Sequence, residues 1–265
     1  MNGTKIQRLA LQAFQTFSKC RRTDAFREQL ATLRDLMNQI TKVEVNFNSQ
    51  LVKNKEVYKP EHGGKPPVTY VHLWEDDVFS MGIFVLRNGA KIPLHDHPGM
   101  HGLIKVLHGK AKLKYYSDLS VDEIPVEVLP QLHPWQIQMT RVVSKCKENE
   151  VNSESEPCLL TPVEGNFHEV CAVDGPMAFL DILSPPYDHV RKCHYYKTLS
   201  PVSKTPKAQE ESNLGGVVCL METAQPHEFF CDQYTYEGPE IEPTWLENDS
   251  TDNRNDMDKP DIRLG

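Results

Sequence analysis

Hydrophobic residues recur at helical spacing near the start of the chain. Between residues 24 and 40, apolar side chains fall every three to four positions, at Phe26, Leu30, Leu33, Met37 and Ile40. This spacing is typical of an amphipathic helix, and Thr23 or Asp24 can cap its first turn. An earlier set with the same spacing consists of Ile6, Leu9, Ala13 and Phe17. We therefore expect residues 1–45 to form a helical segment packed on the rest of the protein.

The pattern changes after a polar stretch, residues 46–67, which we interpret as a linker. From Val68 onward, short segments rich in β-branched and aromatic residues follow one another: VTYVHLWE, VFSMGIFVL, HGLIKVLHG and AKLKYYS. Asn88-Gly89 and His108-Gly109 predict hairpin turns between them, because Asn and Gly accept positive φ at low cost. Many short strands joined by tight turns predict an antiparallel barrel or sandwich.

The second half of the chain continues this β-pattern. Further strand-like segments are CLLTP, FHEVCAV, MAFLDILSP, CHYYKTL and GVVCLME. The charged, Ser-rich residues 144–157 predict a surface loop. We expect one β-domain over residues 68–223 and a C-terminal extension over residues 224–243. Residues 244–265, dominated by Asp and Asn, are expected to be a disordered tail.

Charge and cysteine usage narrow the class of protein. The net charge of -8 at pH 7 and the lack of a basic stripe argue against a nucleic-acid partner. No apolar run reaches the roughly 18 residues of a membrane span, so no membrane partner is expected. Seven scattered cysteines without a CxxC pair favour a reducing, cytoplasmic location. The basic, acid-free first 23 residues leave a mitochondrial location as the alternative. We expect a monomer, because no large apolar stripe is left over.

Candidate metal chemistry begins with a His-x-His pair. In a strand, His95 and His97 point to the same face and Asp96 to the opposite one. Two imidazoles on one face can close on a single metal ion. Pro93 and Pro98 bracket the pair, which suits a strand end. A lone His-x-His is weak evidence, so the remainder of the pattern decides.

A second motif lies about two thirds of the way along the chain. Gly89 stands six residues before His95, and Pro162-Val-Glu-Gly165-Asn-Phe-His168 presents a turn followed by a third histidine. Together these are similar to the two motifs of the cupins. This resemblance implies a mostly β cupin barrel (a double-stranded β-helix, or jelly roll) with N-terminal helices. Most cupins place a glutamate ligand after the His-x-His, where this chain has His101 or Gly102.

The missing glutamate is chemically informative. Three neutral imidazoles leave a ferrous ion with its full double charge, which favours binding of a thiolate. Three histidines on one face also leave open positions for a thiolate, an amine and O2. We therefore predict one Fe(II) per chain on His95, His97 and His168, with O2 as co-substrate. His101 could be a fourth ligand, but we favour an outer position beside the ligands.

Three motifs resemble the cysteamine (2-aminoethanethiol) dioxygenase family, to which plant cysteine oxidases are related. They are PLHDHPGMHG from Pro93, FLDILSPPYD from Phe179 and CHYY from Cys193, in this order. The resemblance runs from about residue 66 to about residue 222. It implies oxidation of cysteamine to hypotaurine, and of N-terminal cysteines of proteins to the sulfinic acid. In animals, the latter implies oxygen-dependent degradation of the marked protein.

The resemblance also implies roles for two polar residues. Asp181 and Tyr187 match residues that line the family's active site. Asp181 could accept a hydrogen bond from the substrate amine or orient a histidine, and Tyr187 could donate to bound dioxygen. Cys193 and Tyr195 could be linked covalently, although residues two apart on one strand are poorly placed for that bond.

Two rival functions remain at this point. A non-enzymatic cupin would bind metal for a regulatory or partner-binding role and consume no O2. A zinc or manganese cupin isomerase is the other, but such proteins normally keep the acidic ligand that this chain lacks. Thiol-dependent oxygen uptake separates the favoured enzyme from both rivals.

Overall fold

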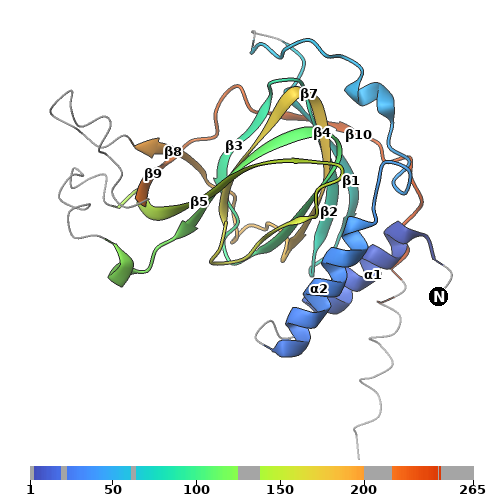
Figure 1. Cartoon of the computed structure of the whole chain (residues 1–265), viewed down its shortest axis with the longest axis horizontal. Coiled ribbons are helices and arrows are strands. Elements are labelled where there is room, and N and C mark those ends of the chain that lie inside the picture. The colour runs from blue at the N-terminus through green and yellow to red at the C-terminus, as the bar shows by residue number, and fades with distance from the viewer. Residues whose placement is uncertain are drawn as a thin grey trace, which may run out of the picture.

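The computed structural model describes residues 3–18, 23–60, 64–124, 138–199, 217–243 and 245. They include two α-helices, two short 3-10 helices (Ser49–Val52 and Val121–Glu123) and ten strands. Figure 1 shows the strands curving into a barrel with both α-helices against one side of it. The strands are β1 Val68–Glu75, β2 Ser80–Leu86, β3 Lys91–Asp96, β4 His101–Asp118, β5 Thr140–Asn152, β6 Cys158–Leu160, β7 Phe167–Ser184, β8 Tyr195–Leu199, β9 Val217–Thr223 and β10 Cys231–Tyr234.

The helices form where the apolar spacing predicted them. In α1, Lys5–Phe17, the Thr4 side chain accepts a hydrogen bond from the backbone N–H of Gln7. In α2, Asp24–Asn38, Thr23 caps the helix in the same way. Such caps satisfy backbone donors that have no partner within the helix. The buried faces of both helices join one core with the outer face of β1, β2, β4 and β7.

The barrel closes because β4 and β7 pair with each other. The strand order is β10-β1-β2-β7-β3-β8-β9-β5-β4-β6, and the additional β7–β4 pairing closes the run from β7 to β4 into a ring. β2, β1 and β10 extend the sheet from β7, and β6 pairs with β4. A closed, mostly β barrel preceded by two α-helices is the predicted architecture. A second core, which includes Ile92, Leu113, Val170 and Phe179, fills the barrel interior. Side chains of β7 therefore alternate between this interior and the core beneath the helices.

Both predicted hairpin turns are wrong. Asn88-Gly89 does form a turn, but β2 and β3 on its two sides each pair with β7 and not with each other. His108-Gly109 lies inside β4, which continues through both segments that the turn was expected to separate. Gly109 has φ +73°, and the pairing of β4 with β7 shifts register between His108 and Lys110. The glycine therefore produces a bulge that bends one long strand. A position with positive φ favours glycine in a bulge as much as in a turn, so the local sequence could not distinguish the two.

Gly109→Ala is expected to lower the free energy of unfolding by about 3 kcal/mol or more. An added Cβ would meet the backbone carbonyl oxygen of Pro176, and the residue would also be strained at its φ of +73°. Gly99→Ala is the matched control, because Gly99 has φ +68° and an added Cβ there would meet nothing within 4 Å. Urea unfolding of both variants should show a clearly smaller loss for Gly99→Ala. Equal losses would mean that the close approach to Pro176 is unimportant.

The predicted surface loop at residues 144–157 is also wrong in its first half. β5 runs through to Asn152 and pairs with β4 along its length. Its glutamates Glu148 and Glu150 are accommodated because they face lysines of β4, as in the Lys112–Glu148 ion pair. Cross-strand pairs of opposite charge favour a strand whose composition resembles that of a loop.

Trp245 differs from the expectation of a disordered tail over residues 244–265. Its side chain is buried, stacks near Phe14 and contacts Trp74 and Phe79. Burial of a large aromatic side chain explains why this position packs although the surrounding sequence is polar. The rest of the predicted tail lies outside the described residues. None of the helices in the described part of the chain is long and apolar enough to span a membrane.

Candidate metal centre

Three histidines from two neighbouring strands converge inside the barrel. His95 lies on β3 directly opposite His168 on β7, and His97 follows β3 by one residue. All three are buried, and one ligand nitrogen from each lies within 4.8 Å of the others. The ring centroids are 4.6 to 4.8 Å apart, with the rings turned edge to face. The structure thus places the three predicted ligands together.

The nitrogen positions fit a metal ion. The Nε2 atoms of His97 and His168 are 3.1 Å apart. Two nitrogens at about 2.1 Å from one ion and at right angles to each other would be separated by about 3.0 Å. Two lone pairs that face each other at this distance repel unless a cation or a proton lies between them. The three imidazoles therefore fit a single ion with open positions on its other side.

The outer nitrogens of two rings have hydrogen-bond partners. His95 Nδ1 is 2.8 Å from the carbonyl oxygen of Pro93, which holds the proton on Nδ1 and leaves Nε2 free. His97 Nδ1 is 2.7 Å from the hydroxyl of Tyr187, whose own proton is donated to the carbonyl of Asp96 at 2.6 Å. Such partners fix the tautomer and the orientation of a metal-binding imidazole.

Burial keeps these imidazoles neutral. It lowers the pKa of His95, and it lowers the pKa of His97 and His168 well below the ordinary value. The mutual repulsion of the three rings adds to the effect at His97. Metal binding requires the neutral form of histidine, so no proton must be removed near neutral pH.

Asp181 faces the same interior as the histidines. It lies opposite Gly82 of β2 and Ile104 of β4, and Ile104 belongs to the interior core. Within the described residues, its carboxyl group forms no hydrogen bond or ion pair. Burial raises its pKa to about 8. When ionised, Asp181 raises the pKa of Tyr187, after the larger effect of burial.

The raised pKa predicts a pH-dependent stability of the metal-free protein. Asp181 ionises near pH 4 when unfolded but near pH 8 when folded, so unfolding releases its proton between these values. The contribution of Asp181 to the free energy of unfolding should therefore fall as pH rises through this window, by at most about 1.4 kcal/mol per pH unit. Asp181→Asn, which cannot ionise, should gain stability relative to the parent from pH 5 to pH 8. Denaturant titrations give the free energy of unfolding at each pH. If it varied with pH in the same way for the parent and for Asp181→Asn, the prediction would be contradicted.

Cys193 and Tyr195 lie beside the same group. The Cys193 thiol lies near the hydroxyls of Tyr195 and Tyr187, and each of the three groups shifts the pKa of its neighbour. Burial raises the pKa of Cys193 to about 11, so the thiol stays protonated. The sulfur and the phenol are therefore close together, while a covalent link between them stays a prediction.

Sequence reasoning missed two further sets of contacts. The Asn166 side chain accepts from the His97 N–H at 3.2 Å and donates to the His97 carbonyl at 2.7 Å. The Asp96 carboxylate accepts from the backbone N–H of His194 at 2.8 Å and from the Tyr196 hydroxyl at 2.9 Å. Both sets hold the His-x-His segment from outside the metal site. Their only sequence signal was the polar character of buried strand positions.

The outer position expected for His101 beside the ligands is wrong. Its ring packs against Phe26 of α2 at 5.2 Å and Phe17 of α1 at 6.2 Å. It shares a strand face with Leu103, which belongs to the core beneath the helices. The alternation of β4 thus turns His101 away from the barrel interior.

Fold and site together define the class of protein. It is a cupin barrel in which a group of three histidines, with no acidic ligand among them, can hold one metal ion. The chain belongs to the PCO_ADO family, whose model matches residues 36–241. It is 39% identical over 228 residues to the 2-aminoethanethiol dioxygenase of Homo sapiens, covering 82% of this chain and 83% of that protein.

Two other relatives extend the comparison. The 2-aminoethanethiol dioxygenase of Mus musculus is 38% identical over 251 residues, covering 90% of this chain and 96% of its own. Plant cysteine oxidase 1 of Arabidopsis thaliana is 31% identical over 176 residues, covering 64% and 55%. The predicted family, and with it the prediction of an enzyme, are confirmed.

Proposed function

We propose that this chain is an Fe(II)-dependent thiol dioxygenase that acts on cysteamine and on N-terminal cysteines of proteins. The observation that carries the proposal is the convergence of three buried, neutral histidines without a carboxylate. Membership of a family with 2-aminoethanethiol dioxygenases and plant cysteine oxidases supports the choice of substrates.

The three histidine ligands are neutral, so a bound divalent ion would keep its full positive charge. Bound Fe(II) would supply a site where a thiolate and O2 meet and exchange electrons. His95, His97 and His168 would hold it, and their outer partners would keep the rings in place. The apolar core next to the histidines, including Val170 and Leu113, limits access of water.

The proposed reaction balances without an added reductant. The S–H bond and the O–O bond break, and two S–O bonds form, giving RSO2H from RSH and O2. The sulfur loses four electrons and the two oxygen atoms gain them. A thiol and O2 are therefore the only co-reactants needed.

Asp181 is proposed to receive the substrate amine. Its buried carboxyl group has no partner in the described part of the chain, and an ammonium or amine beside it would supply one. The Asp181→Asn variant used for the pH profiles also tests this role. KM for cysteamine should rise, and unchanged turnover and KM would remove Asp181 from substrate binding.

Tyr187 is proposed to act mainly by holding His97. Its hydroxyl is already engaged by His97 Nδ1 and the Asp96 carbonyl, so a donor role toward dioxygen would require it to release the carbonyl. Tyr187→Phe is expected to weaken iron binding about tenfold. Chelator competition measures this directly. A raised KM for O2 with unchanged iron affinity would favour the dioxygen role instead.

Anaerobic iron loading followed by admission of air tests the whole proposal. Cysteamine and a Cys-initiated peptide should each gain two oxygen atoms by mass spectrometry, in proportion to bound iron. An N-acetylated peptide, which lacks the free amine, is the control and should stay unmodified. Iron-loaded protein that consumes no O2 with either thiol would refute the proposed activity.

The cellular setting is proposed on the same basis. Five cysteines, Cys158, Cys171, Cys193, Cys219 and Cys231, are free thiols. Free thiols and a ferrous ion both suit a reducing compartment such as the cytoplasm. Oxidation of N-terminal cysteines there would link the fate of the marked proteins to oxygen.

A further inference from the structure

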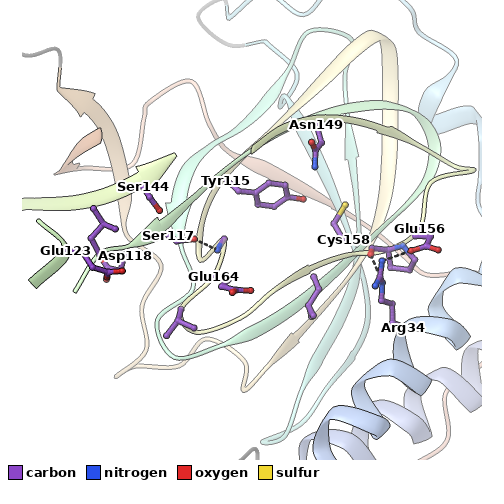
Figure 2. Close-up of a pocket in the computed structure, with 15 residues that line it drawn as sticks. Arg34, Tyr115, Ser117, Asp118, Glu123, Ser144, Asn149, Glu156, Cys158 and Glu164 are labelled. Carbon is purple, nitrogen blue, oxygen red and sulfur yellow. Dashed lines mark hydrogen bonds and ion pairs between the residues drawn. The ribbon is translucent and has the colours of Figure 1, made fainter. Parts of the chain in front are cut away.

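A cleft of about 750 Å³ opens between β4, β5 and residues 156–165. Figure 2 shows Tyr115 at its centre, Asp118, Glu123 and Glu164 on one side and Cys158 on the other. Clefts of this volume hold small ligands or several residues of a peptide.

The cleft carries an excess of negative charge. Its one base, Arg34, is paired with Glu156 at 2.6 Å, so this pair is neutral. In the part of the chain that the structure describes, Asp118, Glu123 and Glu164 form no ion pair. Hydrogen bonds from Ser120 lower the pKa of Glu123 and keep it charged. Burial raises the pKa of Asp118, an effect that the charge of Arg141 opposes. Three like charges at one rim attract a cationic ligand.

Apolar surface and a buried hydroxyl accompany this charge. Val163 is 67% exposed and Leu159 is 38% exposed, and both line the cleft. The ring of Tyr115 is more than nine-tenths buried. Its hydroxyl has no oxygen or nitrogen partner among the described residues and contacts only the Cys158 thiol, a weak partner. A bound main chain would give this hydroxyl a carbonyl acceptor and would cover the two apolar side chains.

The floor of the cleft adjoins the metal centre. The Tyr115 ring centroid is 6.0 Å from that of His168, which lies opposite it on β7. The turn that leads to His168 forms one wall, and the Gly165 N–H donates to Ser117 Oγ of the other wall at 2.9 Å. An extended peptide advances about 3.3 Å per residue, so a few residues span from the centre to the cleft.

We propose that this cleft binds a cationic segment of the polypeptide substrate, a few residues beyond its N-terminal cysteine. The inference rests on the proposed function and deepens it. Lysines or arginines of the substrate would face Asp118, Glu123 and Glu164, and an apolar side chain would rest on Val163. Cysteamine is too small to reach the cleft, so the cleft selects among protein substrates without affecting the small one.

The test compares three substrates on one triple variant. Asp118→Asn, Glu123→Gln and Glu164→Gln together remove the three charges and keep side-chain size. For a Cys-initiated peptide with lysines at its third to sixth positions, KM should rise about tenfold. KM for the same peptide with glutamines at those positions, and for cysteamine, should stay within about twofold. Added salt should raise KM of the parent enzyme for the lysine peptide only.

A matched triple variant controls for net charge. Glu28→Gln, Asp35→Asn and Asp122→Asn remove three exposed acids outside the cleft. An equal rise in KM in this control, or no rise in the cleft variant, would overturn the inference. Cysteamine turnover reports on folding, and the three single variants replace the triple one if it is lost. Anisotropy of a labelled Ser-initiated lysine peptide measures binding directly. Failure of the proposed activity would therefore leave the cleft still testable.

Discussion

His168→Ala is expected to abolish oxidation of both cysteamine and Cys-initiated peptides. His168 supplies one of three converging nitrogens, and the remaining two would hold iron weakly. Loss of a metal ligand removes the ion and the reaction together, so we expect turnover to fall at least about a thousandfold. Bound iron per chain and oxygen uptake, measured on the same sample, check this.

Two further variants sharpen the result. His227→Ala removes an exposed histidine that the metal centre does not include, and it should leave iron content and turnover unchanged. His168→Glu should retain iron but lower thiol oxidation, because a carboxylate cancels part of the charge that attracts the thiolate. A glutamate variant with full activity would refute the argument from three neutral ligands, although the site itself would stand.

The ligands could be found from sequence because their geometry is local. Alternation along one strand places His95 and His97 on the same face whatever the rest of the fold does. His168 needed a second motif, because only the pairing of β3 with β7 brings it opposite His95. The barrel class could be predicted from short strand-like segments and turn residues, because these signals are local and do not depend on tertiary contacts.

The contacts that could not be predicted from the sequence involve residues that are far apart along the chain. No pattern in the sequence predicts a partner for His194, yet its backbone N–H donates to the Asp96 carboxylate, 98 positions earlier. Gly109 was expected in a hairpin turn, and only the approach of Pro176 shows why it bends a strand instead. Periodicity reports which face a side chain occupies. It does not report what the neighbouring strand presents to that face.

Asp96→Ala is expected to weaken both the fold and the metal site. The buried carboxylate accepts hydrogen bonds from the His194 N–H and the Tyr196 hydroxyl, and so ties β3 to the segment that carries Cys193. Its removal leaves buried donors without an acceptor, which should lower the free energy of unfolding by about 3 kcal/mol. Because His95 and His97 flank this residue, iron affinity should fall roughly tenfold to a hundredfold.

Tyr196→Phe separates the two effects of Asp96. It removes one donor and leaves the His194 N–H bonded to the carboxylate, so we expect a loss of about 1 kcal/mol and little change in iron affinity. Urea unfolding of the metal-free proteins and chelator competition give the two quantities independently. If Asp96→Ala unfolded more easily but bound iron as tightly as the parent, Asp96 would support the barrel without positioning the histidines. The hydrogen bonds of Asp96 on one face of β3 would then not affect the metal chemistry of His95 and His97 on the other face.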